Sequence, residues 1–187
     1  MLPILYLDSG IIRSFIEKKP PVLVNLFRTI KDRKWQCFTS TFGILELSNL
    51  KKDDVYLRKG VSNKLEYKEI IKGRDQKNLS SAELKEVRKY IRTFLKKYPH
   101  FSFIDIPQEV WKSALEITLN TNIHSIDAVH LACAIYFGAN LLVTNDGHFI
   151  RESDSLLKNH KLADRIRVVL PEKVFEALSE IGFNLEE

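Results

Sequence analysis

The sequence contains few of the residues that mark disulfide-rich, fibrous or disordered chains. Its 187 residues include only two cysteines, seven glycines and six prolines. Apolar residues make up 44% of the chain and charged residues 28%, which is the composition of an ordinary globular protein. A chain of this length is long enough for one α/β domain with a sizeable core, or for a small domain that carries an insertion.

Cysteine pairs and long apolar runs are also missing. Cys37 and Cys133 stand at no metal-ligand spacing, and we expect both to be reduced, buried packing residues. No apolar run approaches the roughly 20 residues that are needed to span a bilayer. The apolar start of the chain lacks a basic leader and is interrupted by Asp8, which argues against a signal peptide. We therefore expect a cytoplasmic protein with no membrane partner.

Basic residues are unevenly distributed along the chain. The net charge is +5, yet the segment 51–100 has 15 Lys or Arg against 7 Asp or Glu, a local charge of +8. The rest of the chain has 14 Lys or Arg against 17 Asp or Glu, a charge of −3. A positive segment attracts phosphate backbones, although a solvated helical surface has the same composition.

Segments of strand length alternate with segments of helical periodicity along most of the chain. The expected strands are residues 4–7, 36–39, 101–106, 141–144 and 166–170. The expected helices follow Asp8, cover 22–30, begin after Ser40 or Thr41, begin at Pro107, cover 125–137, and begin at Pro171. Strands that are separated by helices predict an α/β fold with a mainly parallel sheet covered on both faces.

The stretch from about 51 to 100 interrupts this alternation. Ser80 and Glu83 have the spacing of a capping box, and apolar residues follow at helical intervals. The opposite face of this helix carries Lys85, Arg88, Lys89, Arg92 and Lys96. Residues 72–78, just upstream, are polar and predict a loop. We therefore expect a single domain over 1–187 with a basic helical insertion at about 51–100.

Two aspartates follow strands directly. Asp8 comes after the first expected strand, and Asp146 comes just after the strand 141–144. Ligands of open α/β sheets bind at the carboxyl ends of the strands, so both side chains are expected on one rim. An aspartate in this position is more often a helix cap or a turn residue, and this alternative applies to each of them separately.

Two further carboxylates lie in helices that are otherwise apolar. Glu46 is flanked by Leu45 and Leu47, and Asp127 by Ile126 and Ala128. A charged group in such a setting needs a compensating partner. A single Arg or Lys is one candidate, but a shared divalent metal explains both carboxylates together.

These segments resemble the PIN-domain nucleases. The resemblance lies in residues 4–9 (ILYLDS), 39–47 (TSTFGILEL), 125–134 (SIDAVHLACA), 142–149 (LVTNDGHF) and 166–175 (IRVVLPEKVF). It covers about 140 of the 187 residues, and the basic insertion is the exception. The resemblance implies a three-layer PIN-like α/β fold and a metal-dependent ribonuclease that hydrolyses RNA.

The resemblance also implies a site of four acids that holds Mg²⁺ or Mn²⁺, with oxygen ligands that suit hard divalent ions. Asp8 and Asp146 would be direct metal ligands, Asp127 would bind the metal or its water, and Glu46 would orient or deprotonate the attacking water. Thr144 and Asn145 match positions that hydrogen-bond a metal water or a phosphate oxygen in the family; strand-end capping is the alternative for them. His124, His130 and His148 match no zinc spacing, and His130 is interpreted as a packing residue.

We expect Arg88, Lys89 and Arg92 of the insertion to contact RNA phosphates. The same face is alternatively only solvated, or docks a second copy of the chain in a homodimer, or docks an acidic antitoxin. VapC-type toxins of this family have a much shorter connection in place of the insertion. This difference puts the toxin role in doubt, but it leaves the four acidic positions intact.

Three other functions compete with the metal-dependent ribonuclease. A catalytically silent PIN-like scaffold that binds RNA or protein is the main alternative, but all four acidic positions are occupied. An aspartyl-nucleophile phosphatase needs a second acid two residues after Asp8, where Gly10 stands. No glycine-rich phosphate loop follows the first strand, which argues against a nucleotide-binding fold.

Overall fold

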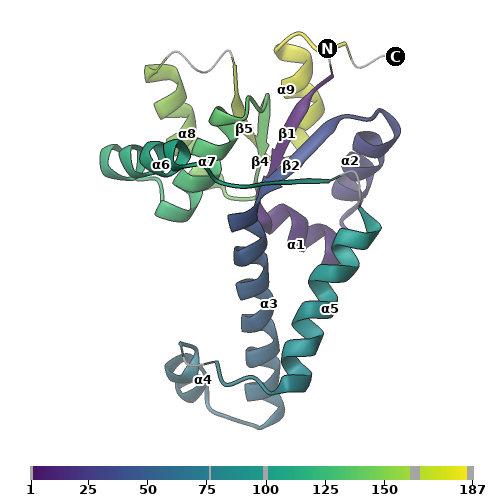
Figure 1. Ribbon diagram of the computed structural model, residues 1–187, viewed down its shortest axis with the longest axis vertical. Coiled ribbons are helices and arrows are strands. Elements are labelled where there is room, and N and C mark those ends of the chain that lie inside the picture. Colours follow the sequence, from purple (N-terminus) through teal and green to yellow (C-terminus); the bar gives the residue numbers. More distant parts are fainter. Residues whose placement is uncertain (1, 76, 99–100, 161–164, 185–187) are drawn as a thin grey trace. The chain divides into compact units, whose positions relative to one another are not determined.

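The computed structural model of the chain describes residues 2–75, 77–98, 101–160 and 165–184. The chain folds into two compact units (Figure 1). The first consists of Met1–Gly43 and His100–Glu187, and the second of Ile44–Pro99. The second unit thus begins a few residues before the expected insertion. That the chain forms a single domain stays a prediction.

The first unit is built on a parallel sheet with strand order β3-β2-β1-β4-β5. Every pair of neighbouring strands is parallel, as we expect for strands that are joined by helical crossovers. The predicted α/β class and the parallel sheet are therefore confirmed. The strands are β1 (Ile4–Leu7), β2 (Gln36–Ser40), β3 (Ser102–Ile104), β4 (Leu141–Val143) and β5 (Arg167–Val169).

Helices cover both faces of this sheet and make three layers. The helices are α1 (Ser9–Glu17), α2 (Pro21–Asp32), α6 (Gln108–Asn120), α7 (Ser125–Tyr136), α8 (Gly147–Asn159) and α9 (Val174–Glu180), with a 3-10 turn η1 (Pro171–Lys173). Helices α6, α7 and α8 bury their apolar residues against Tyr6, Phe38 and Leu142 of the strands. Helix α9 packs on β4 and β5, and α1 packs on α2, where Phe15 stacks on Phe27. Both faces are therefore dry, which is why the strands are almost uniformly apolar.

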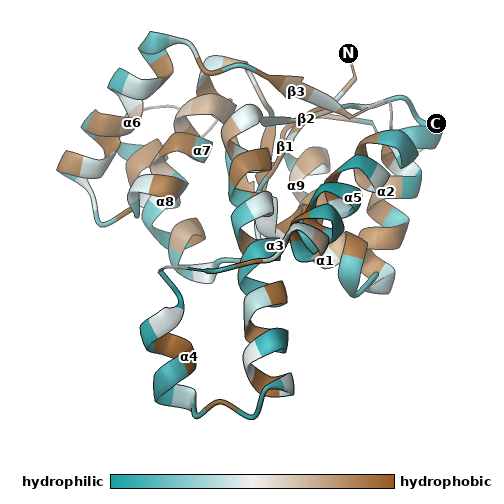
Figure 2. Cartoon of the chain, turned by 60° about the horizontal axis from the view of Figure 1, so that its bottom comes forward, coloured by the Kyte–Doolittle hydropathy of each residue, from teal (hydrophilic) through white to brown (hydrophobic). Residues whose placement is uncertain are grey.

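The second unit is helical. Helix α3 (Thr41–Ser62) starts directly after β2, and most of it belongs to the second unit. Helices α4 (Tyr67–Gly73) and α5 (Ser81–Lys97) follow. Helices α3 and α5 lie side by side (Figure 1). Ser80 and Glu83 form the predicted capping box at the start of α5. Hydrophilic residues dominate α5, whereas α7 of the first unit is mainly hydrophobic (Figure 2).

Ion pairs connect the helices of the second unit. Glu86 of α5 pairs with Arg58 and lies 3.7 Å from Lys51, and Glu83 lies 3.2 Å from Lys59. The acidic residues of α5 thus face α3. In addition, Asp53 of α3 lies 2.9 Å from Arg74 and 2.5 Å from Lys77; burial alone would raise the pKa of Asp53, but these two cations lower it.

Helices α4 and α8 were not expected from the sequence, and residues 72–78 were expected to be a loop. Helix α4 reaches Gly73, so the first part of that segment is helical. Helix α8 has few buried apolar side chains, chiefly Phe149 and Leu157, and so gives a weak periodic signal. Both helices begin at a carboxylate, Glu66 or Asp146, which satisfies amide groups that would otherwise be unpaired.

Cys37 and Cys133 are free and buried, as predicted, and burial raises the pKa of the Cys133 thiol to about 11. Among the described residues, no helix combines the length and the apolar character that crossing a membrane requires.

Asn140 connects three strands at their amino ends. Its Oδ1 accepts from the Ile4 amide (2.8 Å), its own amide donates to the Ile4 carbonyl (2.8 Å), and its carbonyl accepts from the Arg167 amide (3.0 Å). Replacing Asn140 with Ala leaves the Ile4 amide without its side-chain acceptor. We predict a loss of about 1–3 kcal/mol in the free energy of unfolding, measured by urea denaturation.

Asn120→Ala is the control for this prediction. The Asn120 side chain is exposed and, among the described residues, bonds to Glu116 of its own helix. Its loss is expected to stay within about 0.5 kcal/mol. Equal losses in the two variants would contradict the role of Asn140.

Candidate active site

The pairing of β1 with β4 brings the two strand-end aspartates to one rim. Leu7 pairs with Val143, and the Asp8 amide donates to the Val143 carbonyl at 3.1 Å. The residue after each strand therefore lies beside its counterpart. Asp8 and Thr144 are these residues, and Asp146 follows two positions later.

Asp8 is held at both of its carboxylate oxygens. Its Oδ1 accepts from the Gly10 amide and the Ser9 hydroxyl, both at 3.3 Å, and so caps α1. Its Oδ2 accepts from the Thr144 hydroxyl at 2.8 Å. The carboxylate is half-buried. The capping alternative thus applies to Asp8, but it does not remove the residue from the rim.

Asp146 is linked to Asp8 through Thr144. The Asp146 amide donates to the Thr144 hydroxyl oxygen at 3.1 Å. Its carboxylate Oδ1 accepts from the amides of His148 (2.7 Å) and Phe149 (3.0 Å), which caps α8. Both of these bonds use Oδ1, so the exposed Asp146 still offers Oδ2 to a ligand.

Helix α7 contributes Asp127 and His130 to the same region. Asp127 is half-buried in the first turn, and His130 is one turn further along the same helix face. The His130 Nε2 lies 3.7 Å from Asp8 Oδ1, and the ring is completely buried. The face of α7 that carries Asp127 is therefore turned toward Asp8.

The remaining candidate residues are distributed as follows. Thr144 is buried, with its hydroxyl engaged by Asp8 and Asp146, while Asn145 is exposed and donates to the Ser14 hydroxyl at 3.3 Å. Their contacts with substrate stay predictions. Four candidates lie in the second unit: Glu46 is half-buried on α3, and the exposed cations of α5 are Arg88, Lys89 and Arg92.

Sequence reasoning missed the polar groups beneath Asp8. The Tyr6 hydroxyl lies 2.7 Å from His130 Nδ1 and 3.0 Å from Ser40 Oγ, and all three residues are buried. Burial raises the pKa of the Tyr6 phenol, which stays protonated. The spacing of these residues in the sequence could have revealed them. Tyr6 stands two residues before Asp8 and therefore on the same strand face, and His130 stands three residues after Asp127 and therefore on the same helix face.

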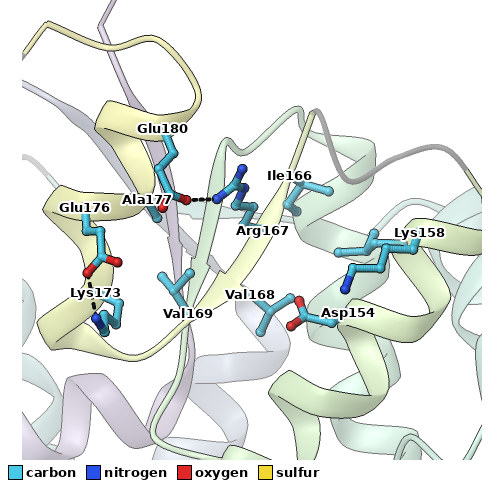
Figure 3. Close-up of a pocket in the computed structure, with 11 residues that line it drawn as sticks. Asp154, Lys158, Ile166, Arg167, Val168, Val169, Lys173, Glu176, Ala177 and Glu180 are labelled. Atoms are coloured by element: carbon cyan, nitrogen blue, oxygen red, sulfur yellow. Dashed lines mark hydrogen bonds and ion pairs between the residues drawn. The ribbon is translucent and has the colours of Figure 1, made fainter.

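A separate pocket of about 420 Å³ opens beside the edge strand β5, between α8 and α9 (Figure 3). Arg167 pairs there with Glu180, and Lys173 lies 2.6 Å from Glu176 (Figure 3). Burial raises the pKa of Asp154 in the same lining. None of the four candidate carboxylates lines this pocket. Its charges largely neutralise one another, so it is not the candidate active site.

The donors of the strand-end site fit a hard divalent cation. Asp8, Asp127 and Asp146 supply carboxylate oxygens, the ligand type that Mg²⁺ and Mn²⁺ prefer. Asp8 and His130 are close enough for each to offer an atom to one cation. Asp146 has an oxygen that its helix cap does not use.

The family model of the PIN domain matches residues 5–154, which include β1 to β4 and all four candidate acids. The chain belongs to the PIN domain family. The match extends across both compact units, so the segment 44–99 lies inside the matched region of this PIN domain. The PIN-like three-layer fold that the sequence predicted is confirmed.

Two solved structures share the fold of this PIN domain. One is VapBC2 from Rickettsia felis bound to a DNA fragment from their promoter, with 17% identity, a TM-score of 0.53, and coverage of 89% of this chain and 98% of the other. The second is DNA-bound VapBC from Salmonella typhimurium, with 14% identity, a TM-score of 0.54, and coverage of 91% and 99%. No curated protein matches the chain at a significant level.

The geometry predicts that the Thr144 hydroxyl stabilises the site. In Thr144→Val, the shape is kept, but Asp8 Oδ2 loses a donor and the Asp146 amide loses an acceptor. We expect the metal-free protein to lose about 1–3 kcal/mol of unfolding free energy in urea denaturation.

Thr118→Val makes the same chemical change on α6, where the hydroxyl donates to the Ala114 carbonyl of its own helix at 2.9 Å. This control is expected to lose less than about 0.5 kcal/mol. If the two variants are equally stable, Thr144 does not support the site.

Proposed function

We propose that this PIN domain is a metal-dependent endoribonuclease that hydrolyses RNA phosphodiester bonds. The observation that carries the proposal is the hydrogen-bonded connection from Asp8 through Thr144 to Asp146. It sets two carboxylates at the carboxyl ends of neighbouring parallel strands, next to the face of α7 that carries Asp127. Ligands of such sheets bind at this rim.

Asp8, Asp127 and Asp146 would hold Mg²⁺ or Mn²⁺. A bound divalent ion would neutralise phosphate charge and lower the pKa of a water molecule. Glu46 is the remaining acid of the proposed set, and it would orient the attacking water or accept its proton. Thr144 keeps the Asp8 carboxylate in place, and Asn145, exposed next to it, is available to a phosphate oxygen.

The basic face of α5 would bind the RNA backbone. The hollow along this face has a volume of about 560 Å³ and is lined by Lys85, Arg88, Lys89, Arg92, Thr93 and Lys96. Within the described part of the chain, none of these cations forms an ion pair, because the acids of α5 are paired with α3. Unpaired exposed cations attract phosphates without reading sequence.

A toxin role with an antitoxin partner is the biological setting that we propose, in the cytoplasm. It is supported by the fold shared with chains of two VapBC structures. The three aspartates that would hold the metal follow β1 and β4 or lie on α7, so the length of the segment between Glu46 and Asp127 does not argue against the proposed metal site.

We predict that RNA cleavage requires Mn²⁺ or Mg²⁺ and is lost in Asp8→Asn and in Asp146→Asn. Each change removes a ligand charge and leaves the shape of the side chain. Glu46→Gln is expected to lower kcat by about 10²–10⁴-fold, the usual contribution of a general base. Cleavage of mixed RNAs by purified protein, with and without Mn²⁺, measures these effects.

Asp32→Asn is the matched control, because Asp32 is an exposed acid at the end of α2. It should cleave like the wild type. Near wild-type cleavage by both Asp8→Asn and Asp146→Asn would sink the assignment. A catalytically silent scaffold would, in addition, show no rise in melting temperature with millimolar Mn²⁺, whereas metal binding to the folded state raises it.

The basic face yields a separate prediction. Replacing Arg88, Lys89 and Arg92 with Gln should weaken binding to unrelated single-stranded RNAs and lower the salt slope by roughly 0.7 per lost phosphate contact. Fluorescence anisotropy at several salt concentrations measures both quantities. Affinity for Mn²⁺ should not change.

The control variant replaces three exposed cations of the first unit with Gln, namely Lys18, Arg28 and Lys31. It removes the same net charge and should leave the salt slope near the wild-type value. Equal slopes for both triple variants would reject the RNA role of α5. A change in oligomeric state confined to the α5 variant would assign this face to a homodimer instead, and rejects the RNA role as well.

A further inference from the structure

A buried polar network lies behind Asp8 in the first unit. The Tyr6 hydroxyl oxygen lies 3.0 Å from Ser40 Oγ and 2.7 Å from His130 Nδ1, and His130 Nε2 lies at ion-pair distance from Asp8 Oδ1 (3.7 Å). Ser40 Oγ also accepts from the Gly43 amide at 3.1 Å. Tyr6, Ser40 and His130 are buried, so bulk water does not reach these groups. A buried polar network is retained at a cost unless its groups are satisfied.

The contacts of this network favour one of the two neutral tautomers of His130. The Tyr6 phenol has a single proton, which can go to Ser40 Oγ at 3.0 Å or to His130 Nδ1 at 2.7 Å. The shorter contact favours His130, and the Ser40 hydroxyl can then donate to the Tyr6 oxygen. If Nδ1 accepts this proton, a neutral imidazole carries its own proton on Nε2. That N–H then faces the Asp8 carboxylate. The other tautomer would set the Nε2 lone pair against a carboxylate, which is repulsive in a buried environment.

Aromatic neighbours keep the ring in this orientation. Phe42 and Tyr6 lie with ring centroids 5.9 Å and 5.6 Å from that of His130, each tilted by 59°. On the other side of the carboxylate, the Thr144 hydroxyl donates to Asp8 Oδ2. Asp8 therefore has a fixed polar group at each oxygen.

We propose that Tyr6 and His130 act together as positioning residues that fix the Asp8 carboxylate for metal binding. Tyr6 favours the Nε2–H tautomer of His130, and that N–H, which points at Asp8 Oδ1 from 3.7 Å, favours one orientation of the carboxylate by electrostatic attraction. The proposal rests on the proposed function, because there Asp8 is a metal ligand. It gives His130 no direct contact with the metal. Groups that orient ligands in this way usually change metal affinity by about 10–100-fold when they are lost.

A matched pair of variants tests the direction of the His130 contact. The amide nitrogen of Gln reaches as far as Nε2 of histidine, whereas that of Asn reaches only as far as Nδ1. His130→Gln thus keeps a donor toward Asp8, and His130→Asn does not. We expect His130→Asn to bind Mn²⁺ about 10-fold more weakly in calorimetry, and His130→Gln to restore most of the affinity.

Tyr6→Phe tests the other half of the network with a smaller change. It removes one oxygen from a buried ring and should preserve the fold, as judged by circular dichroism. Nitrogen-15 NMR of histidine-labelled, metal-free protein reports the tautomer directly. We expect the Nε2–H pattern for wild-type His130 and its loss or mixing in Tyr6→Phe, together with Mn²⁺ binding that is weaker by about 10-fold.

The outcomes separate this proposal from the proposed function. An Nδ1–H pattern in the metal-free wild type overturns the proposal, whether or not the protein cleaves RNA. Equal Mn²⁺ affinities in His130→Gln and His130→Asn also overturn the proposal. If both variants bind weakly, His130 is a direct ligand or only a packing residue. If both match the wild type, His130 has no role in metal binding. Wild-type protein that neither binds Mn²⁺ nor cleaves RNA refutes the proposed function and, with it, the metal-positioning role.

Discussion

The register between β1 and β4 is the constraint on which the candidate site depends. Because Leu7 pairs with Val143, the residues that leave the two strands emerge side by side. A shift of one residue would turn every side chain of one strand to the opposite face. Asp8 would then point away from α7, and Thr144 would no longer reach it. The apolar faces of both strands, buried on each side of the sheet, hold this register in place.

Helix capping and ligand binding use the same aspartates without conflict. Asp8 and Asp146 each accept backbone amides of the helix that follows, mainly through one oxygen. The cap fixes where the carboxylate stands, because the amides of the first helical turn bind it. A residue that caps a helix at the rim of a parallel sheet is therefore already oriented to receive a cation. The interpretation as a cap and the interpretation as a site are compatible for both residues.

The acidic and the basic residues of α5 in the second unit occupy different faces of the helix. On α5, Glu83 and Glu86 pair with cations of α3 and so connect the two helices. The basic residues occupy another face, at spacings of three and four residues, and stay exposed. The cations of α5 are thus gathered on a face that its acids do not share. A face of this kind attracts polyanions in general.

The sequence by itself determined the strands, most helices, the parallel sheet and the four candidate acids, because apolar periodicity and strand-end carboxylates are local signals. It did not give α4 or α8, whose apolar patterns are short. Only the tertiary structure decided that the Thr144 hydroxyl joins Asp8 to Asp146, and that His130 and Tyr6 form a polar network. Each of these contacts joins residues more than a hundred positions apart or depends on the sheet register, and no local pattern encodes such distances. From the sequence, a histidine in an apolar helix is explained as well by packing as by a polar contact. Only the fold shows that His130 contacts the Tyr6 hydroxyl of β1.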